Sequence, residues 1–173
     1  KKAQTEEWLG VQEEAHRQGM RTSVTMMYGM GESNADRIEH LLKIRDLQAR
    51  TGGFTAFICW PLQPEGTPMF DGTAKTDAVT YLRTLAMGRI ICRNIPNMQS
   101  SWVTMGHKVG QVALRFGAND YGSLMMEENV VSAAGTTYRA TLEEMERMIT
   151  DAGFTARRRR QDYSLIEEAA AAA

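Results

Sequence analysis

Hydrophobic residues recur first at helical spacing and then at strand spacing, and this alternation repeats along the chain. Trp8, Val11 and Ala15 lie at helical spacing, which indicates an amphipathic helix. Thr5 can cap this helix at its start, and Gly19 can end it. The run that follows, RTSVTMMY, contains β-branched and bulky residues and predicts a buried strand.

The same pair of elements is expected three more times. Ser33 and Asp36 form a variant of the capping box at the start of a second helix, which GlyGly at 52–53 ends. Later strands are expected at 54–60 (FTAFICW), 98–104 (MQSSWVT) and 121–126 (YGSLMM), with helices at 76–93 and 107–116 and a last helix from a Thr141–Glu144 capping box to Gly153, followed by the extended segment FTARRRR. This order predicts an α/β fold with about four parallel strands and flanking helices.

Two architectures fit this alternation, an open doubly wound sheet or part of a (β/α) barrel. Four strands cannot close a barrel, so the barrel interpretation implies that half of it is missing. Both architectures bind ligands at the carboxyl ends of their strands. Polar and aromatic residues gather just after the predicted strands, at Glu32, Trp60, Gln63, Trp102 and Glu127.

Composition narrows the class of protein. A chain of 173 residues with 43% hydrophobic and 24% charged residues can form one domain with a sizeable core. Its formal net charge of -1 provides no general footprint for nucleic acid or an anionic membrane. No apolar stretch approaches the ~20 residues needed to cross a bilayer, and KKAQTEEW lacks the apolar segment of a secretion signal. We therefore expect a soluble, cytoplasmic protein that binds neither nucleic acid nor membrane.

The segment TMMYGMGE at 25–32 contains the main candidate ligand loop. Gly29 and Gly31 would let a flat ligand approach the backbone, and Glu32 would place a carboxylate at the rim. Alternatively, the glycines only turn the chain and Glu32 favours the positive end of the next helix. GxGxxG is not completed, so no dinucleotide fingerprint is present.

Other reactive residue types give weaker signals. His16 and His40 suit surface or packing roles, and His107 alone is placed where it can face a site. No Ser-His-Asp set and no zinc spacing can be assembled, so no metal or catalytic residue is assigned. Cys59 and Cys92 lack CxxC spacing and are expected to be buried thiols.

Aromatic, acidic and basic residues near the expected rim each have two interpretations. Trp60 and Trp102 either stack on a ligand or belong to the core. Glu127 offers an acid-base group or hydroxyl clamp, or only begins a helix. The four arginines at 157–160 are interpreted as a solvated edge.

A resemblance extends this interpretation. TMMYGMGE resembles the GxIxGxxE motif on the fifth barrel strand of radical S-adenosylmethionine enzymes, with Gly29 and Glu32 matching, Met27 at the isoleucine and Thr25 at the first glycine. From about Thr5 to Tyr163 the chain resembles the C-terminal portion of the cyclic dehypoxanthinyl futalosine synthase family. The segments that carry this likeness are RIEHLLKIRDLQARTGGFTAFICWPLQPEGTPM, YLRTLAMGRIICRNIPNMQSSWVTMG, GQVALRFGANDYGSLMMEENVVSAAGT and MITDAGFTARRRRQDY. ENVVSAAGT at 128–136 favours this family over aminofutalosine synthase and the deazaflavin-chromophore enzymes.

The resemblance implies a fold, a reaction and a set of site residues. Residues 1–163 would form the C-terminal half of a TIM-type barrel, and 164–173 a poorly structured tail. In such enzymes of menaquinone biosynthesis a [4Fe-4S] cluster reduces S-adenosylmethionine, and the resulting radical takes a ribose hydrogen from dehypoxanthine futalosine before a ring closes. The implied S-adenosylmethionine contacts are Met27, Gly29, Gly31 and Glu32. The substrate candidates Gln63, Trp102 and Glu127 are placed by their positions after the predicted strands.

The chain departs from the family pattern in two places. The cluster motif CxxxCxxC is absent, and Cys59 and Cys92 cannot replace its three thiolates. The cluster ligands and the N-terminal half of the barrel would come from elsewhere, so the isolated chain is expected to be inactive. Met30-Gly31 stands where the family usually has His-Val, which leaves a related nucleoside substrate open. A non-enzymatic module that docks its strand edges against a partner is the alternative from another class.

Overall fold

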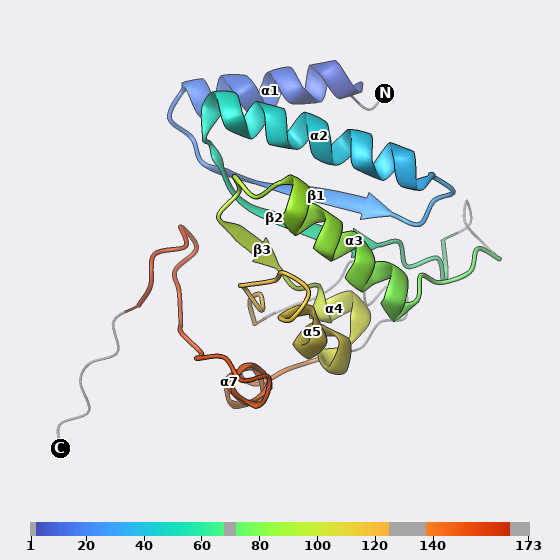
Figure 1. The fold of residues 1–173 in the computed structure, drawn as a ribbon, viewed down its shortest axis with the longest axis vertical. Helices are drawn as coiled ribbons and strands as arrows, with labels where there is room; N and C mark the ends of the chain where they lie inside the picture. Colours follow the sequence, from blue (N-terminus) through green and yellow to red (C-terminus); the bar gives the residue numbers. More distant parts are fainter. Residues whose placement is uncertain (1–2, 68–71, 125–137, 167–173) are drawn as a thin grey trace.

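The structure is a computed structural model that describes residues 3–67, 72–124 and 138–166. Within these ranges, three strands and six helices follow one another along the chain (Figure 1). They are α1 (Thr5–Arg17), β1 (Thr22–Tyr28), α2 (Asn34–Thr51), β2 (Phe54–Pro61), α3 (Ala78–Ile91), β3 (Asn97–Gln99), α4 (Trp102–Met105), α5 (His107–Ala113) and α7 (Leu142–Asp151). The strands form one open parallel sheet in the order β1-β2-β3, which confirms the predicted α/β fold.

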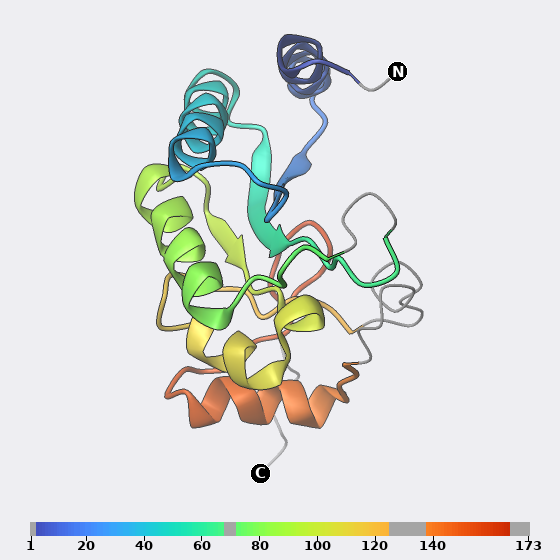
Figure 2. The ribbon, with the colours of Figure 1, turned by 90° about the vertical axis from the view of Figure 1, so that its right-hand side faces the viewer.

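In the described part of the chain, helices cover only one face of this sheet. Helices α2 and α3 lie side by side on that face, α1 packs against α2, and α5 packs against α3 and α7 (Figure 2). Strand β1 has the matching alternation, with Val24, Met26 and Tyr28 buried while the intervening side chains are exposed. Each buried side chain of this size stabilises the fold by ~1.5–3 kcal/mol. No helix of the described chain covers the opposite face, which we call the open face.

The helix ends follow local chemistry. In both predicted capping boxes, Ser33 with Asp36 and Thr141 with Glu144, each half of the reciprocal pair of hydrogen bonds is present. The first helix is capped by Gln4 rather than by Thr5, because the Gln4 backbone N–H donates to the Glu7 carboxylate at 2.7 Å. None of the helices in the described ranges is long and apolar enough to span a bilayer.

The third strand is shorter than predicted. It ends at Gln99, and Trp102, predicted to be in the strand, begins helix α4. The Ser101 N–H donates to the Tyr81 hydroxyl at 2.8 Å, and the Ser101 hydroxyl donates to the Cys59 carbonyl at 2.6 Å. These bonds to distant segments draw the chain away from the strand direction.

The predicted fourth strand does not form in the described residues. Asp120 makes one isolated parallel bridge with Gln99, and 121–124 are not in a strand. The Gly122 N–H bonds to the Asp120 side chain at 3.0 Å, which turns the chain locally instead of extending it. The sheet therefore has three strands where about four were expected, and 125–126 lie outside the described residues.

Candidate functional site at the carboxyl ends of the strands

The loop after β1 is closed by its own glutamate. The Glu32 carboxylate accepts hydrogen bonds from the backbone N–H groups of Gly29 and Met30, both at 2.8 Å. A carboxylate that accepts two backbone donors fixes the path of the chain between them. Glu32 thus shapes the predicted ligand loop from within, and its oxygens are engaged by the loop's own backbone.

Arg37, on the first turns of α2, supports this carboxylate from behind. Its Nε and Nη2 lie 2.9 and 2.7 Å from Glu32 Oε1, and the guanidinium lies over the Tyr28 ring at 4.6 Å from its centre. The Arg37 and Glu32 side chains are 12% and 20% exposed. Burial of Glu32 raises its pKa, but the bonds from Gly29, Met30 and Arg37 outweigh it and hold the pKa below the ordinary value.

The two glycines of the loop have different surroundings. A Cβ at Gly29 would lie 2.8 Å from the Thr76 hydroxyl, so close packing excludes a side chain there. Gly31 has a φ of 104°, and a Cβ there would meet no atom within 4 Å. Its left-handed backbone favours glycine, while the space beside it is open. The loop therefore presents accessible backbone at Gly31 to the carboxyl end of the sheet, which fits the approach of a flat ligand.

An apolar lining adjoins this loop on the open face. Met27 is paired in register with Trp60 of β2, so their side chains lie side by side at the carboxyl end of the sheet. Met27 is exposed and Trp60 is half-buried. The Leu62 N–H donates to the Tyr28 carbonyl at 2.7 Å and holds the next loop beside β1.

The predicted substrate residues have different positions. Gln63 is buried, and its amide donates to the carbonyls of Pro61 and Leu62 within its own loop. The Trp102 ring is 2% exposed and stacks on the His107 ring, with 5.0 Å between the centres. Of the two interpretations of Trp102, burial in the core therefore holds for most of its ring. Glu127 lies outside the described residues.

His16 and His107 make structural contacts. His107, which was expected to face a site, lies 2.6 Å through Nε2 from the Arg139 carbonyl and thereby joins α5 to the segment before α7. Since a carbonyl only accepts, this nitrogen carries the proton. His16 is buried against Phe54, and burial of His40 lowers its pKa.

Two contributors escaped the sequence patterns. In the sequence Arg37 resembles any exposed arginine on a helix. Its partner Glu32 lies before the N-cap of that helix, so the pair does not follow the spacing of ion pairs within a helix. Gln99 is the last residue of β3 and alternates with the core residue Met98, which places its side chain toward the open face. Strand alternation was the available signal for Gln99, but the overlong strand prediction obscured where the strand ends.

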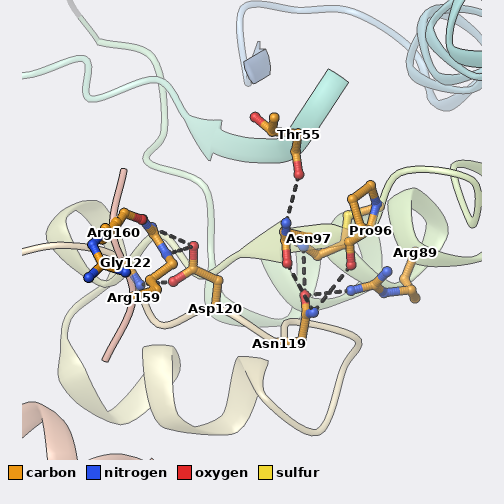
Figure 3. Close-up of polar contacts among 10 residues, drawn as sticks. Thr55, Arg89, Pro96, Asn97, Asn119, Asp120, Gly122, Arg159 and Arg160 are labelled. Carbon is orange, nitrogen blue, oxygen red and sulfur yellow. Dashed lines mark hydrogen bonds and ion pairs between the residues drawn. The ribbon is translucent and has the colours of Figure 1, made fainter. Parts of the chain in front are cut away.

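Polar residues join the edge of β3 to the C-terminal segment. The Asn119 side chain accepts from the Met98 N–H and from Arg89 Nη2, both at 2.8 Å (Figure 3). Next to it, Asp120 accepts from Gly122 with one oxygen and from Arg159 with the other. Arg159 is therefore half-buried and paired, which corrects the interpretation of 157–160 as a wholly solvated run.

The comparison with known proteins decides the family. The family model described as the CofH/MqnC C-terminal region matches residues 51–172, more than half of the chain. The chain belongs to the CofH/MqnC family. This confirms the resemblance found in the sequence.

Members of the CofH/MqnC family with two different names resemble the chain. Proteins named cyclic dehypoxanthine futalosine synthase from Halalkalibacterium halodurans and Streptomyces coelicolor are both 45% identical to it, over 93% and 91% of the chain. A Methanosarcina barkeri protein named 5-amino-6-(D-ribitylamino)uracil–L-tyrosine 4-hydroxyphenyl transferase 1 is 38% identical over 98% of the chain. The matches cover 43%, 39% and 47% of these relatives, so the chain spans less than half of their length.

Proposed function

We propose that this chain is the C-terminal part of a radical S-adenosylmethionine enzyme that converts dehypoxanthine futalosine into cyclic dehypoxanthine futalosine. The observation that carries the proposal is the glycine loop that Glu32 closes beside Met27 and Trp60. The chain is also more similar in sequence to the two synthases than to the transferase. The loop lies at the carboxyl end of a parallel strand, where α/β enzymes bind their ligands.

In this proposal each loop residue has a binding role. The backbone around Met27 and Gly31 receives S-adenosylmethionine, and Glu32 holds that backbone in place without direct contact. Met27 and Trp60 supply an apolar wall that excludes water. When bound, S-adenosylmethionine and its [4Fe-4S] cluster supply the radical that removes a hydrogen from the substrate ribose.

The cluster itself does not fit the described residues. No group of three His, Cys, Asp or Glu side chains in the described ranges is placed to hold a metal ion. Cys59 and Cys92 are both buried, and burial raises the pKa of each thiol to about 12, which opposes thiolate ligation. We therefore place the cluster ligands in the part of the relatives that this chain does not span, and residues 1–163 in the second half of their barrel.

The missing half has a defined place to bind. Strand β1 is at the edge of the sheet, so part of its backbone faces away from β2. A parallel strand from the N-terminal half would pair with this edge and enclose the open face. Burial of Met27 and Thr25 inside a barrel would follow.

The transferase activity is the second candidate. The Methanosarcina barkeri relative is 38% identical over 98% of the chain. The resemblance to the synthase family implies His-Val at the position where this chain has Met30-Gly31. This position adjoins the proposed ligand loop, so its change bears on the choice of substrate.

One experiment separates these activities. The chain is co-expressed with the N-terminal part of the Halalkalibacterium halodurans synthase that it does not span, and the complex is reconstituted anaerobically with iron and sulfide. Dehypoxanthine futalosine is offered in one reaction, and 5-amino-6-(D-ribitylamino)uracil with L-tyrosine in another. Mass spectrometry is expected to find the cyclic product in the first reaction alone. The coupled product in the second reaction would support the transferase, and 5′-deoxyadenosine without either product would refute both.

A further inference from the structure

Two side-chain nitrogen donors lie close to each other beside Gly122. A Cβ at Gly122 would lie 3.2 Å from Trp102 Nε1 and 3.4 Å from Gln99 Nε2. The two side chains come from different elements, β3 and α4, yet they approach the same point. We call the place where the Gln99 and Trp102 nitrogens lie beside Gly122 the donor recess.

Neither donor has a hydrogen-bond partner among the described residues. The hydrogen bonds of this region involve Ser100, Asp120 and Tyr121, and the Gln99 amide and the Trp102 indole N–H take part in none of them. An indole nitrogen can only donate, and the amide nitrogen carries two further donor hydrogens. Polar groups at the margin of a packed core are normally satisfied, so two neighbouring donors without a partner in the described part of the chain call for an acceptor.

The position of the donor recess relates it to the rim. Gln99 pairs in register with Ile58 of β2, two residues before Trp60, and Trp60 is opposite Met27. The recess therefore lies next to the Met27–Trp60 wall, two residues along β2 from Trp60 and farther from the carboxyl end of the sheet. A ligand on this wall would place one of its polar groups within reach of Gln99.

The backbone around the recess is held firmly. Gly122 has a φ of 108°, a left-handed conformation that disfavours any other residue. Its N–H is bonded to Asp120, which pairs with Arg159, and the Ser100 N–H donates to the Asp120 carbonyl at 2.8 Å. A site that relies on two donors gains selectivity when their separation is fixed in this way.

We propose that the donor recess binds one oxygen atom of the nucleoside substrate, with Gln99 Nε2–H and Trp102 Nε1–H donating to it. Both donors are neutral, and both nitrogens lie within 3.4 Å of one point beside Gly122. Such a pair suits a hydroxyl, carbonyl or carboxylate oxygen. This assignment rests on the proposed function, and it makes Gln99 a substrate-binding residue that the sequence patterns did not identify. It also gives Trp102 a role through its N–H while its ring stays in the core.

The test uses the co-expressed complex described above. Gln99→Leu removes one donor at nearly constant volume, and Trp102→Phe removes the other while keeping an aromatic ring. Each variant is expected to raise KM for the nucleoside about ten-fold, with kcat changed less than about three-fold. Gln99→Glu replaces the donor by a carboxylate, which cannot donate to the substrate oxygen and repels it, so this variant is expected to raise KM further. Gln18→Leu, at the exposed C-cap residue of α1, is the matched control and should leave KM unchanged.

Further measurements separate the possible outcomes. 5′-Deoxyadenosine formed without substrate and the melting temperature of Gln99→Leu should match the unsubstituted complex, which excludes a folding or S-adenosylmethionine effect. The KM increase caused by Gln99→Leu is then measured with substrate analogues that each lack one ribose hydroxyl. If the increase disappears with one analogue, the bound oxygen is that sugar hydroxyl. If it persists with all of them, the bound oxygen is a carbonyl or carboxylate oxygen elsewhere in the substrate. Unchanged KM in both Gln99→Leu and Trp102→Phe would overturn the donor recess, whereas an unsubstituted complex without product would refute the proposed function instead.

Discussion

Arg159 pairs with Asp120 across 39 residues of sequence, with Nη2 and Nε at 2.7 and 3.1 Å from Asp120 Oδ2. The two side chains are 19% and 9% exposed, so water screens their attraction less than at an open surface. The other Asp120 oxygen accepts from Gly122 (Figure 3). The C-terminal segment is thereby attached to the turn that forms the donor recess.

Arg159→Met is expected to lower the free energy of unfolding by about 1–3 kcal/mol. The substitution keeps the aliphatic length but leaves a largely buried carboxylate without its cation. Urea denaturation measures this change, and Arg157→Met at an exposed neighbour should have almost no effect. Equal stability of the two variants would show that the pair contributes nothing.

Glu32→Gln is expected to loosen the glycine loop while the core stays intact. A neutral amide loses the charge-assisted bonds from Arg37 and cannot accept both backbone N–H groups with two oxygens. Hydrogen exchange of the Gly29 and Met30 amides should become about ten-fold faster, which corresponds to about 1.4 kcal/mol. Glu39→Gln removes the carboxylate of an exposed ion pair on α2, the helix that carries Arg37. It serves as the control and should leave the exchange of these amides unchanged.

The protection of this loop should also depend on pH in one direction. The folded-state pKa of Glu32 is lowered, so its contribution to stability is fully present above its unfolded pKa of roughly 4.3. The contribution is lost as pH falls through the lower folded-state pKa. Exchange rates corrected for intrinsic chemistry should be flat from about pH 5 upward and should rise below roughly pH 4. A loop whose protection is the same at pH 3 and pH 6 would contradict this role of Glu32.

His16 predicts a second pH dependence, in global stability. Its ring nitrogens lie 2.7 Å from the Thr51 hydroxyl and 2.9 Å from the Thr22 hydroxyl, beneath the edge of Phe54. Burial lowers the pKa of His16, nearby Arg21 lowers it further, and Glu13 opposes both. Because the folded-state pKa is lowered, the stabilisation is present above the unfolded value of about 6.5 and is lost as pH falls.

Urea denaturation at several pH values measures this loss. The free energy of unfolding should decrease from about pH 7 to pH 5, and His16→Gln should have a smaller slope over this range. Part of the slope should persist, because burial also lowers the pKa of His40. The double variant His16→Gln with His40→Gln is therefore the matched reference. A His16→Gln slope equal to that of the unsubstituted chain would exclude His16 as a source.

Local patterns predicted the elements whose causes are local. The capping boxes at Ser33 and Thr141 formed because each donor and acceptor pair lies within one helical turn. The strand and helix alternation up to β2 followed from periodicity alone. The hydrogen bonds that close the Glu32 loop are also local, since they span two and three residues, but the glycine pattern did not predict that Glu32 would accept them.

Contacts between distant residues decided what the patterns missed. Helix α4 begins directly after Ser101, because the Ser101 N–H donates to the Tyr81 hydroxyl and the Ser101 hydroxyl donates to the Cys59 carbonyl, 20 and 42 residues away. The sequence predicted that Arg159 is one of four solvated arginines, and only the structure shows that it pairs with Asp120. Gln99 gains its candidate role only when Trp102 and Gly122 lie next to it. No spacing in a single sequence reports such pairs.

The chain alone is expected to form no iron–sulfur cluster. Cys59 and Cys92 are buried, and the Cys92 thiol is 3.3 Å from the Leu41 carbonyl, to which it donates. Both thiols should react with a thiol reagent only after denaturation, because burial disfavours the thiolate form.

Anaerobic reconstitution of the isolated chain with iron and sulfide tests this expectation directly. Absorbance near 400 nm and 5′-deoxyadenosine should stay at background, and the Cys59→Ala, Cys92→Ala double variant should behave identically. Addition of the N-terminal half from the Halalkalibacterium halodurans relative should restore both signals in either background, because the ligands would come from that half. One cluster per isolated chain, with cleavage of S-adenosylmethionine, would show that this chain carries cluster ligands of its own and would refute the division of the site between two halves of a barrel.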